Sequence, residues 1–169
     1  MKIKNKNDNM CLVWSVLAHK FPSTSNPCLI SSYRQHLKTL KIDNISFPVR
    51  EGDIKSFSID NKLSIRLWEI DIEQGKIWIS SETMAGDPED IINLLLYNNH
   101  ISLIKKLDTL ISFFIESRVF ICQYCARCVF HGILALERHI SICNSFPIEN
   151  LIQLPTKKFI KFTNTLKRE

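Results

Sequence analysis

The spacing of three cysteines and one histidine in the last third of the sequence constrains the fold of this chain more than any other feature. The residues Cys122, Cys125, His139 and Cys143 follow the pattern C-x2-C-x13-H-x3-C. The first pair has the spacing of a short knuckle, and the i and i+4 spacing of the second pair puts both side chains on one face of a helix. Three thiolates and an imidazole form a tetrahedral ligand set for Zn²⁺. The pattern therefore predicts a small C2HC zinc finger, whose folding the metal would drive because so few residues bury too little core.

Apolar residues and a further cysteine accompany these ligands. Phe130 and Leu136 lie between the two ligand pairs, and we expect them to cover the metal site. Cys128 forms a second C-x2-C pair with Cys125 and is an alternative to Cys122 as a ligand. Because Cys128 is so close to Phe130 that it would crowd the knuckle, Cys122 is the preferred ligand.

The expected helix of the finger, residues 132–142, argues against sequence-specific recognition of DNA. A finger that reads DNA presents Arg, Lys, Asn or Gln side chains to base edges. This helix reads GILALERHISI, and Arg138 is its only arginine. A structural finger, or one that contacts protein, is the favoured interpretation.

Composition indicates an intracellular protein with a basic C-terminal segment. Hydrophobic residues make up 45% of the 169 residues, the net charge is +5, and there are six cysteines, which cluster mainly in the metal motif. We expect a reducing compartment, nucleus or cytoplasm, and no contact with a membrane, because the chain starts with a polar segment and has no apolar run of membrane-spanning length. The basic residues of segment 156–169 suggest a solvated tail, with weak, non-specific contact to nucleic acid as the alternative.

The order of helical and strand patterns predicts an α+β fold. Helical patterns come first, at residues 11–19, 29–40 and 51–62. Strand patterns follow, at residues 63–70, 77–80, 91–97 and 101–107, and segment 109–121 fits either a helix or a strand. Helices followed by strands predict an α+β architecture with N-terminal helices and a small antiparallel sheet. The expected units are a domain over residues 1–112, the zinc finger over 117–146 and a basic linker or tail over 147–169.

Cys11 and His100 are the residues that could carry covalent catalysis. Cys11 begins an apolar helix, whose dipole lowers the pKa of a thiol at that end. His100 lies between two strand patterns and could act as the general base, and Asp8 could place a polar group near a developing oxyanion. A cysteine at such a position is more often a small buried hydrophobe, and a histidine after two asparagines is more often a turn residue. The residues alone leave both interpretations open.

Two segments resemble ovarian-tumour-type (OTU-like) cysteine peptidases. The segment DNMCLVWSV, residues 8–16, resembles the nucleophile motif of that family, and INLLLYNNH, residues 92–100, resembles the strand and turn that carry its histidine. The resemblance implies a papain-like fold, in which Cys11 attacks an amide or isopeptide carbonyl, for example of a ubiquitin-like substrate, and His100 accepts the proton.

The sequence departs from the OTU-like pattern at three positions. Asn9 replaces the usual glycine, Ile101 replaces an aromatic residue, and Ser102 stands where an acid or amide often orients the histidine. Asp108 is the nearest substitute for that acid. These departures are those expected of a degenerate, inactive version of the fold.

A broader resemblance links the order of these segments to proteins of Polinton/Maverick-type transposons. The order comprises the Cys11 segment, the His100 segment, the C2HC finger and the stretch LPTKKFIKF over residues 154–162. In those proteins a similar region precedes a protein-primed, B-family DNA polymerase. The resemblance implies an accessory region of such a polymerase, because the carboxylate motifs of the exonuclease and polymerase domains do not occur in this sequence.

Overall fold

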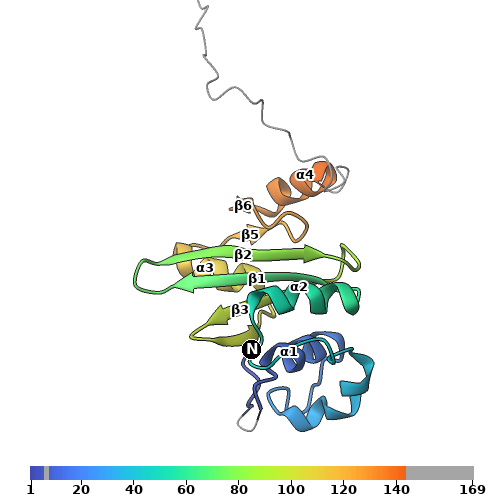
Figure 1. Cartoon of the computed structure of the whole chain (residues 1–169). Helices are drawn as coiled ribbons and strands as arrows, with labels where there is room; N and C mark the ends of the chain where they lie inside the picture. Colours follow the sequence, from blue (N-terminus) through green and yellow to red (C-terminus); the bar gives the residue numbers. More distant parts are fainter. Residues whose placement is uncertain (6–7, 144–169) are drawn as a thin grey trace, which may run out of the picture.

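The computed structural model describes residues 1–5 and 8–143 (Figure 1). The predicted tail, residues 147–169, and the last residues of the predicted finger lie outside the described residues. The helices are α1 (Cys11–Lys20), the 3₁₀ helices η1 (Ile30–Ser32) and η2 (Arg34–Thr39), α2 (Glu51–Asp60), α3 (Leu107–Ile115) and α4 (Ile133–Cys143). The strands are β1 (Ser64–Asp71), β2 (Lys76–Met84), β3 (Ile91–Tyr97), β4 (His100–Leu103), β5 (Phe120–Ile121) and β6 (Val129–Phe130).

The main sheet confirms the predicted α+β class, but it is mixed. Its four strands lie in the order β2-β1-β3-β4, and the pairs β1–β2 and β3–β4 are antiparallel. The prediction of a wholly antiparallel sheet is wrong because β1 and β3 are parallel. After β2 the chain passes the start of β1 and places β3 on the other side of that strand.

At Gly86 the crossing segment lies directly against the backbone that leads into β1. A Cβ atom at position 86 would lie 2.3 Å from the carbonyl oxygen of Lys62, so only glycine fits against that backbone. The amide of Ala85 donates to the carbonyl of Leu63, and the amide of Gly86 donates to the hydroxyl of Ser64, both at 3.3 Å. These bonds hold the crossing segment against the start of β1.

The two faces of the sheet pack against different parts of the chain, because successive side chains of a strand point to opposite faces. On one face, Ile65 and Leu67 of β1 and Ile92 and Leu94 of β3 join a core with α1 and α2. The other face contributes Trp68 to a second core with α3 and the start of the finger, which includes Leu107, Ile111, Val119 and Ile121. In Figure 1, α2 and α3 accordingly lie on opposite sides of the sheet.

Local structure differs from the sequence expectations in the short elements. The stretch predicted as one helix over residues 29–40 forms two 3₁₀ helices instead. The fourth strand ends at Leu103 rather than at residue 107. The segment 109–121, which fitted either a helix or a strand, contains most of helix α3 and then strand β5. Between β3 and β4 lies a two-residue hairpin turn with positive φ angles at Asn98 and Asn99, which asparagine tolerates well.

Candidate metal centre

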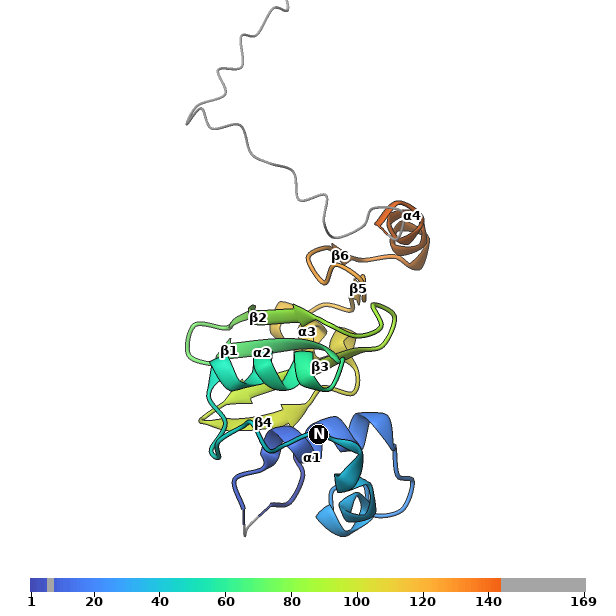
Figure 2. The same ribbon diagram turned by 45° about the vertical axis from the view of Figure 1, so that its right-hand side comes forward.

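The four predicted ligands lie on the unit formed by the β5–β6 hairpin and helix α4. Two ligands come from the turn after β5 and two from α4. Cys122 directly follows β5, and Cys125 ends the short knuckle after it. His139 and Cys143 lie on α4, one turn apart, as the i and i+4 spacing requires. The views in Figures 1 and 2 both place α4 beside the β5–β6 hairpin at one end of the molecule.

The ligand atoms of Cys122, Cys125, His139 and Cys143 all lie within 4.8 Å of one another. The Sγ atoms of Cys122 and Cys143 are 3.8 Å apart, and Cys125 Sγ is 3.4 Å from His139 Nε2. In a tetrahedral zinc site with the usual bond lengths, two sulfur atoms are separated by about 3.8 Å and a sulfur and a nitrogen by about 3.6 Å. The arrangement therefore fits a metal ion such as zinc, and the chemistry of the donors favours zinc among divalent metals.

The three thiols are close enough to perturb one another's ionisation. Burial raises the pKa of Cys143 to about 12, with added contributions from the hydrogen bond to Cys122 and the charge of Cys125. Burial acts in the same direction on Cys125, but hydrogen bonds from the Arg127 amide, His139 and the neighbouring thiols outweigh it and lower its pKa to about 7. Thiolates packed this closely repel one another, so all three ionise together only when a cation neutralises them.

The knuckle between the cysteines has the backbone turn that such a site needs. The amide of Ala126 donates to the carbonyl of Cys122 at 2.8 Å, which closes the turn. Ala126 itself has a φ of 50°, in the left-handed region that an L-residue adopts only at a cost. The turn also aims the Arg127 amide at the sulfur of Cys125.

The residues around the ligands largely follow the sequence prediction. The ring of Phe130 lies 5.0 Å from that of His139, and Leu136 is buried, so both cover the site as expected. Cys128 is not part of the converging group, which contains Cys122 instead. Burial, followed by the charge of the neighbouring Cys125, raises the pKa of the Cys128 thiol.

Three polar side chains to which the sequence reasoning gave no role in the finger tie this unit to β1 and α3. Arg66 of β1 donates from Nη1 to the carbonyl of Gln123 at 3.1 Å and from Nη2 to that of Tyr124 at 2.9 Å. The carboxylate of Asp108 accepts from the amide of Ile121 at 2.8 Å, and the hydroxyl of Ser112 accepts from the amide of Val119 at 3.1 Å. The sequence contains one signal for the burial of Arg66. Arg66 lies two residues before Trp68 in a strand, so the two side chains point to the same face, and a tryptophan on that face indicates that it is covered.

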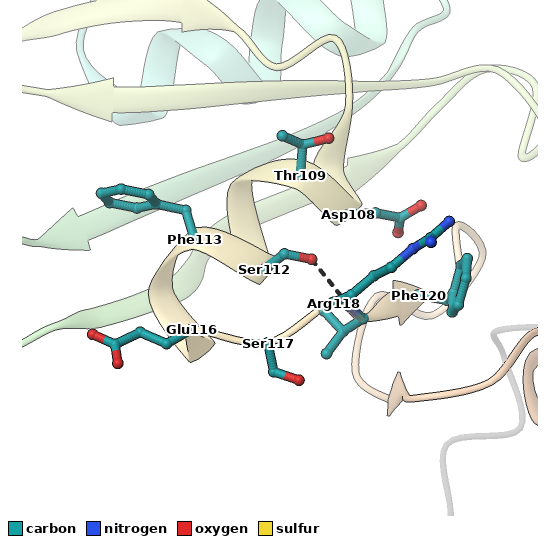
Figure 3. A pocket seen from close by; sticks show the side chains of 9 residues that line it. Asp108, Thr109, Ser112, Phe113, Glu116, Ser117, Arg118 and Phe120 are labelled. Atoms are coloured by element: carbon teal, nitrogen blue, oxygen red, sulfur yellow. Dashed lines mark hydrogen bonds between the residues drawn. The ribbon is translucent and has the colours of Figure 1, made fainter.

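A hollow of about 590 Å³ lies beside this junction. Figure 3 shows Arg118 extended alongside the ring of Phe120, and the guanidinium carbon is 5.7 Å from the ring centre. The dashed bond in Figure 3 joins Ser112 to the backbone of Val119. Since the polar groups of Asp108 and Ser112 already serve the backbone, and Arg118 and Phe113 are exposed, the hollow is a surface feature of the junction.

The residues predicted for catalysis lie on α1, β4 and the segment before α1. Cys11 is the first residue of α1, and α1 packs against β4, whose first residue is His100. No hydrogen bond joins Cys11 to His100 among the described residues. The carboxylate of Asp8 accepts from the amide of Met10 at 2.9 Å and from the indole of Trp14 at 3.1 Å, so it holds the start of α1.

Strand alternation places His100 away from α1. Ile101 and Leu103 of β4 are buried in the core that α1 joins, so the His100 side chain between the turn and Ile101 points to the opposite face. Its Nε2 atom is buried and has no hydrogen-bond partner among the described residues. Burial, and next the charge of Lys2, lower the pKa of His100. The Cys11–His100–Asp8 site stays a prediction.

The fold and the cluster define an α+β protein with a Cys3His group able to bind a metal ion such as zinc. Comparisons of the chain with protein-family models, with curated proteins and with solved structures found no match. Across residues 1–5 and 8–143, every helix is too short or too polar to cross a membrane.

Proposed function

We propose that the chain binds one Zn²⁺ through Cys122, Cys125, His139 and Cys143, and that the ion has a structural role. The observation that carries this proposal is the convergence of the four ligand atoms within 4.8 Å. A closed set of four protein ligands leaves no position for water or substrate, as in structural rather than catalytic zinc sites.

The ion, when bound, supplies the free energy that a unit of this size lacks. Zinc binding to finger peptides contributes about 10–16 kcal/mol at neutral pH. The β5–β6 hairpin has two residues in each strand, and Leu136 is the buried side chain of α4. When bound, the metal would therefore link the knuckle to α4 in place of a larger apolar core.

The exposed surface of α4 favours contact with a protein over contact with DNA. Ile133, Leu134 and Ile142 are 49%, 67% and 61% exposed. Single apolar residues on a surface are common, but three on one short helix offer contact area of the kind found at protein interfaces. Arg138 is the one basic side chain on that helix besides the histidine ligand, too few for a base-reading helix.

The zinc content of purified protein tests the proposal. Wild type is expected to carry one zinc per chain by elemental analysis, and Cys143→Ser and His139→Asn are expected to lose it. Cys28→Ser and Cys128→Ser are matched controls that remove a cysteine outside the cluster and are expected to keep the metal. A folded wild type that takes up no zinc from a zinc-containing buffer would refute the proposal.

A cysteine hydrolase of the OTU-like type is the second candidate function, and one contact favours it. The hydroxyl of Ser15, one turn after Cys11, donates to the carbonyl of Ile101 at 3.4 Å, so the helix of the nucleophile touches the strand of the histidine. Against it stands the strand alternation that turns His100 to the other face. Labelling with a ubiquitin-type electrophilic probe, lost in both Cys11→Ala and His100→Ala, would support hydrolysis. A probe that labels the two variants as strongly as wild type would exclude these residues.

The role as an accessory region of a protein-primed DNA polymerase is a further proposal and has its support in the resemblance of the sequence segments. It is compatible with a finger that contacts protein. Co-purification of the chain with a B-family polymerase from the same source, dependent on the apolar residues of α4, is the expected result. Equal recovery with Leu134→Asp would contradict it.

A further inference from the structure

Arg66 joins the proposed metal site to the main sheet. Its side chain is fully buried, with a relative exposure of 0%. A buried guanidinium is costly unless its donors are satisfied, and here they find both a carboxylate and backbone carbonyls. The acceptors that the guanidinium binds therefore indicate the role of Arg66.

The first partner of Arg66 is its neighbour across the strand pair. Arg66 of β1 is paired in register with Glu82 of β2. Arg66 Nε donates to Glu82 Oε1 at 2.7 Å, and Nη2 lies 2.5 Å from the same oxygen. This contact fixes the direction of the guanidinium within the sheet.

The second set of partners belongs to the knuckle. Gln123 and Tyr124 are the two residues between the ligands Cys122 and Cys125, and their carbonyls accept from Nη1 and Nη2 of Arg66. A planar guanidinium offers its donors in a fixed fork, so two carbonyls bound to it are held at a defined spacing. The backbone that carries the two sulfur ligands is thereby set by a side chain of β1.

We propose that Arg66 is a positioning residue of the zinc site. It holds the C-x2-C knuckle in its metal-binding form on the sheet, and zinc binding in turn keeps Arg66 satisfied. The metal and the main sheet are therefore energetically coupled, although the hydrogen bonds of Arg66 go to the knuckle backbone and to Glu82 rather than to a ligand atom. This inference rests on the proposed zinc site.

The test compares zinc affinity of full-length variants by competition with a chromophoric chelator. The double variant Arg66→Met with Glu82→Gln removes the fork without leaving an unpaired carboxylate. Arg118→Met is the control for the loss of an arginine side chain near the finger, because Arg118 lies over the Phe120 ring but makes no hydrogen bond to the knuckle among the described residues. Glu82→Gln alone separates the effect of the carboxylate.

The double variant is expected to bind zinc at least tenfold more weakly than wild type, with Arg118→Met unchanged. Cobalt substitution adds a spectroscopic readout: the thiolate charge-transfer band of the double variant is expected to be altered at saturation, because the sulfur ligands are less firmly placed. A folded double variant with wild-type affinity and spectrum would overturn the role of Arg66 and leave the zinc site standing. A folded wild type that binds neither metal would overturn both.

Wild-type protein provides the same test if the double variant does not fold. Hydrogen exchange is measured over residues 64–71 with zinc and after its removal by a chelator. Faster exchange in this segment of β1 without zinc supports the coupling. Unchanged exchange there, with increased exchange in α4, overturns it.

Discussion

The replacement of Ala126 by glycine is expected to tighten metal binding, although glycine usually weakens a protein. Ala126 has a φ of 50°, and its amide closes the knuckle on the carbonyl of Cys122. The left-handed region costs an L-residue about 1–2 kcal/mol. Glycine removes that cost but loses about 0.5–1 kcal/mol more conformational freedom on folding.

The mid-values of these two ranges leave a net gain of about 0.75 kcal/mol for Ala126→Gly. This gain corresponds to a roughly three- to fourfold lower dissociation constant for zinc if knuckle formation and metal binding occur together. Competition with a chromophoric chelator measures this change directly. The thermal unfolding midpoint of the zinc-loaded protein should rise in parallel.

Ala135→Gly is the matched control. Ala135 is an exposed residue of α4, where the backbone is helical and glycine costs about 1 kcal/mol. The same substitution should therefore weaken zinc binding at position 135 and strengthen it at position 126. Weaker binding by both variants would refute the reasoning that strain at Ala126 is released in the metal-bound knuckle.

Two further predictions concern the fold. Gly86→Ala is expected to destabilise the protein by about 1–3 kcal/mol, because its Cβ would lie 2.3 Å from the Lys62 carbonyl. Gly52→Ala, which meets nothing within 4 Å, should not lower the unfolding midpoint, and equal losses in denaturant unfolding would contradict the close crossing. The second concerns His100, whose pKa burial lowers from the ordinary 6.5, so the unfolded chain takes up a proton there more readily than the folded one. The stability of wild type relative to His100→Gln should therefore fall as pH decreases below 6.5, whereas a difference independent of pH from 7.5 to 5 would contradict the burial of Nε2.

The ligand set was predictable from the sequence because it depends on local spacing. A C-x2-C pair brings two sulfurs together through one turn, and His139 and Cys143 meet on a helix through its periodicity alone. The apolar cover from Phe130 and Leu136 follows from the same short stretch. The structure confirms the convergence of these four side chains.

The sheet could not be predicted to the same depth, because strand order depends on contacts far apart in the sequence. Alternation located the strands but does not say on which side of β1 the third strand lies. The crossing depends on one close approach at Gly86, a residue that looks like an ordinary turn glycine in the sequence. Segment 109–121 stayed ambiguous because it contains a helix and a strand in succession.

The anchoring of the finger on the sheet was hidden for a related reason. Alternation puts Arg66 on the same face as Trp68, but the groups that its guanidinium binds appear only when residues 123 and 124 fold back over it. Asp108, considered as an acid for catalysis, instead accepts from the backbone of β5. The distant backbone groups that such polar residues bind leave no local pattern in the sequence.

X-ray absorption at the zinc edge of the purified chain identifies the atoms that bind the metal. The proposed site should give three sulfur ligands at about 2.3 Å and one nitrogen ligand at about 2.0–2.1 Å, the distances usual for zinc thiolate and imidazole ligands. A shell with two sulfur atoms, or one dominated by oxygen, would contradict the Cys122, Cys125, His139 and Cys143 site.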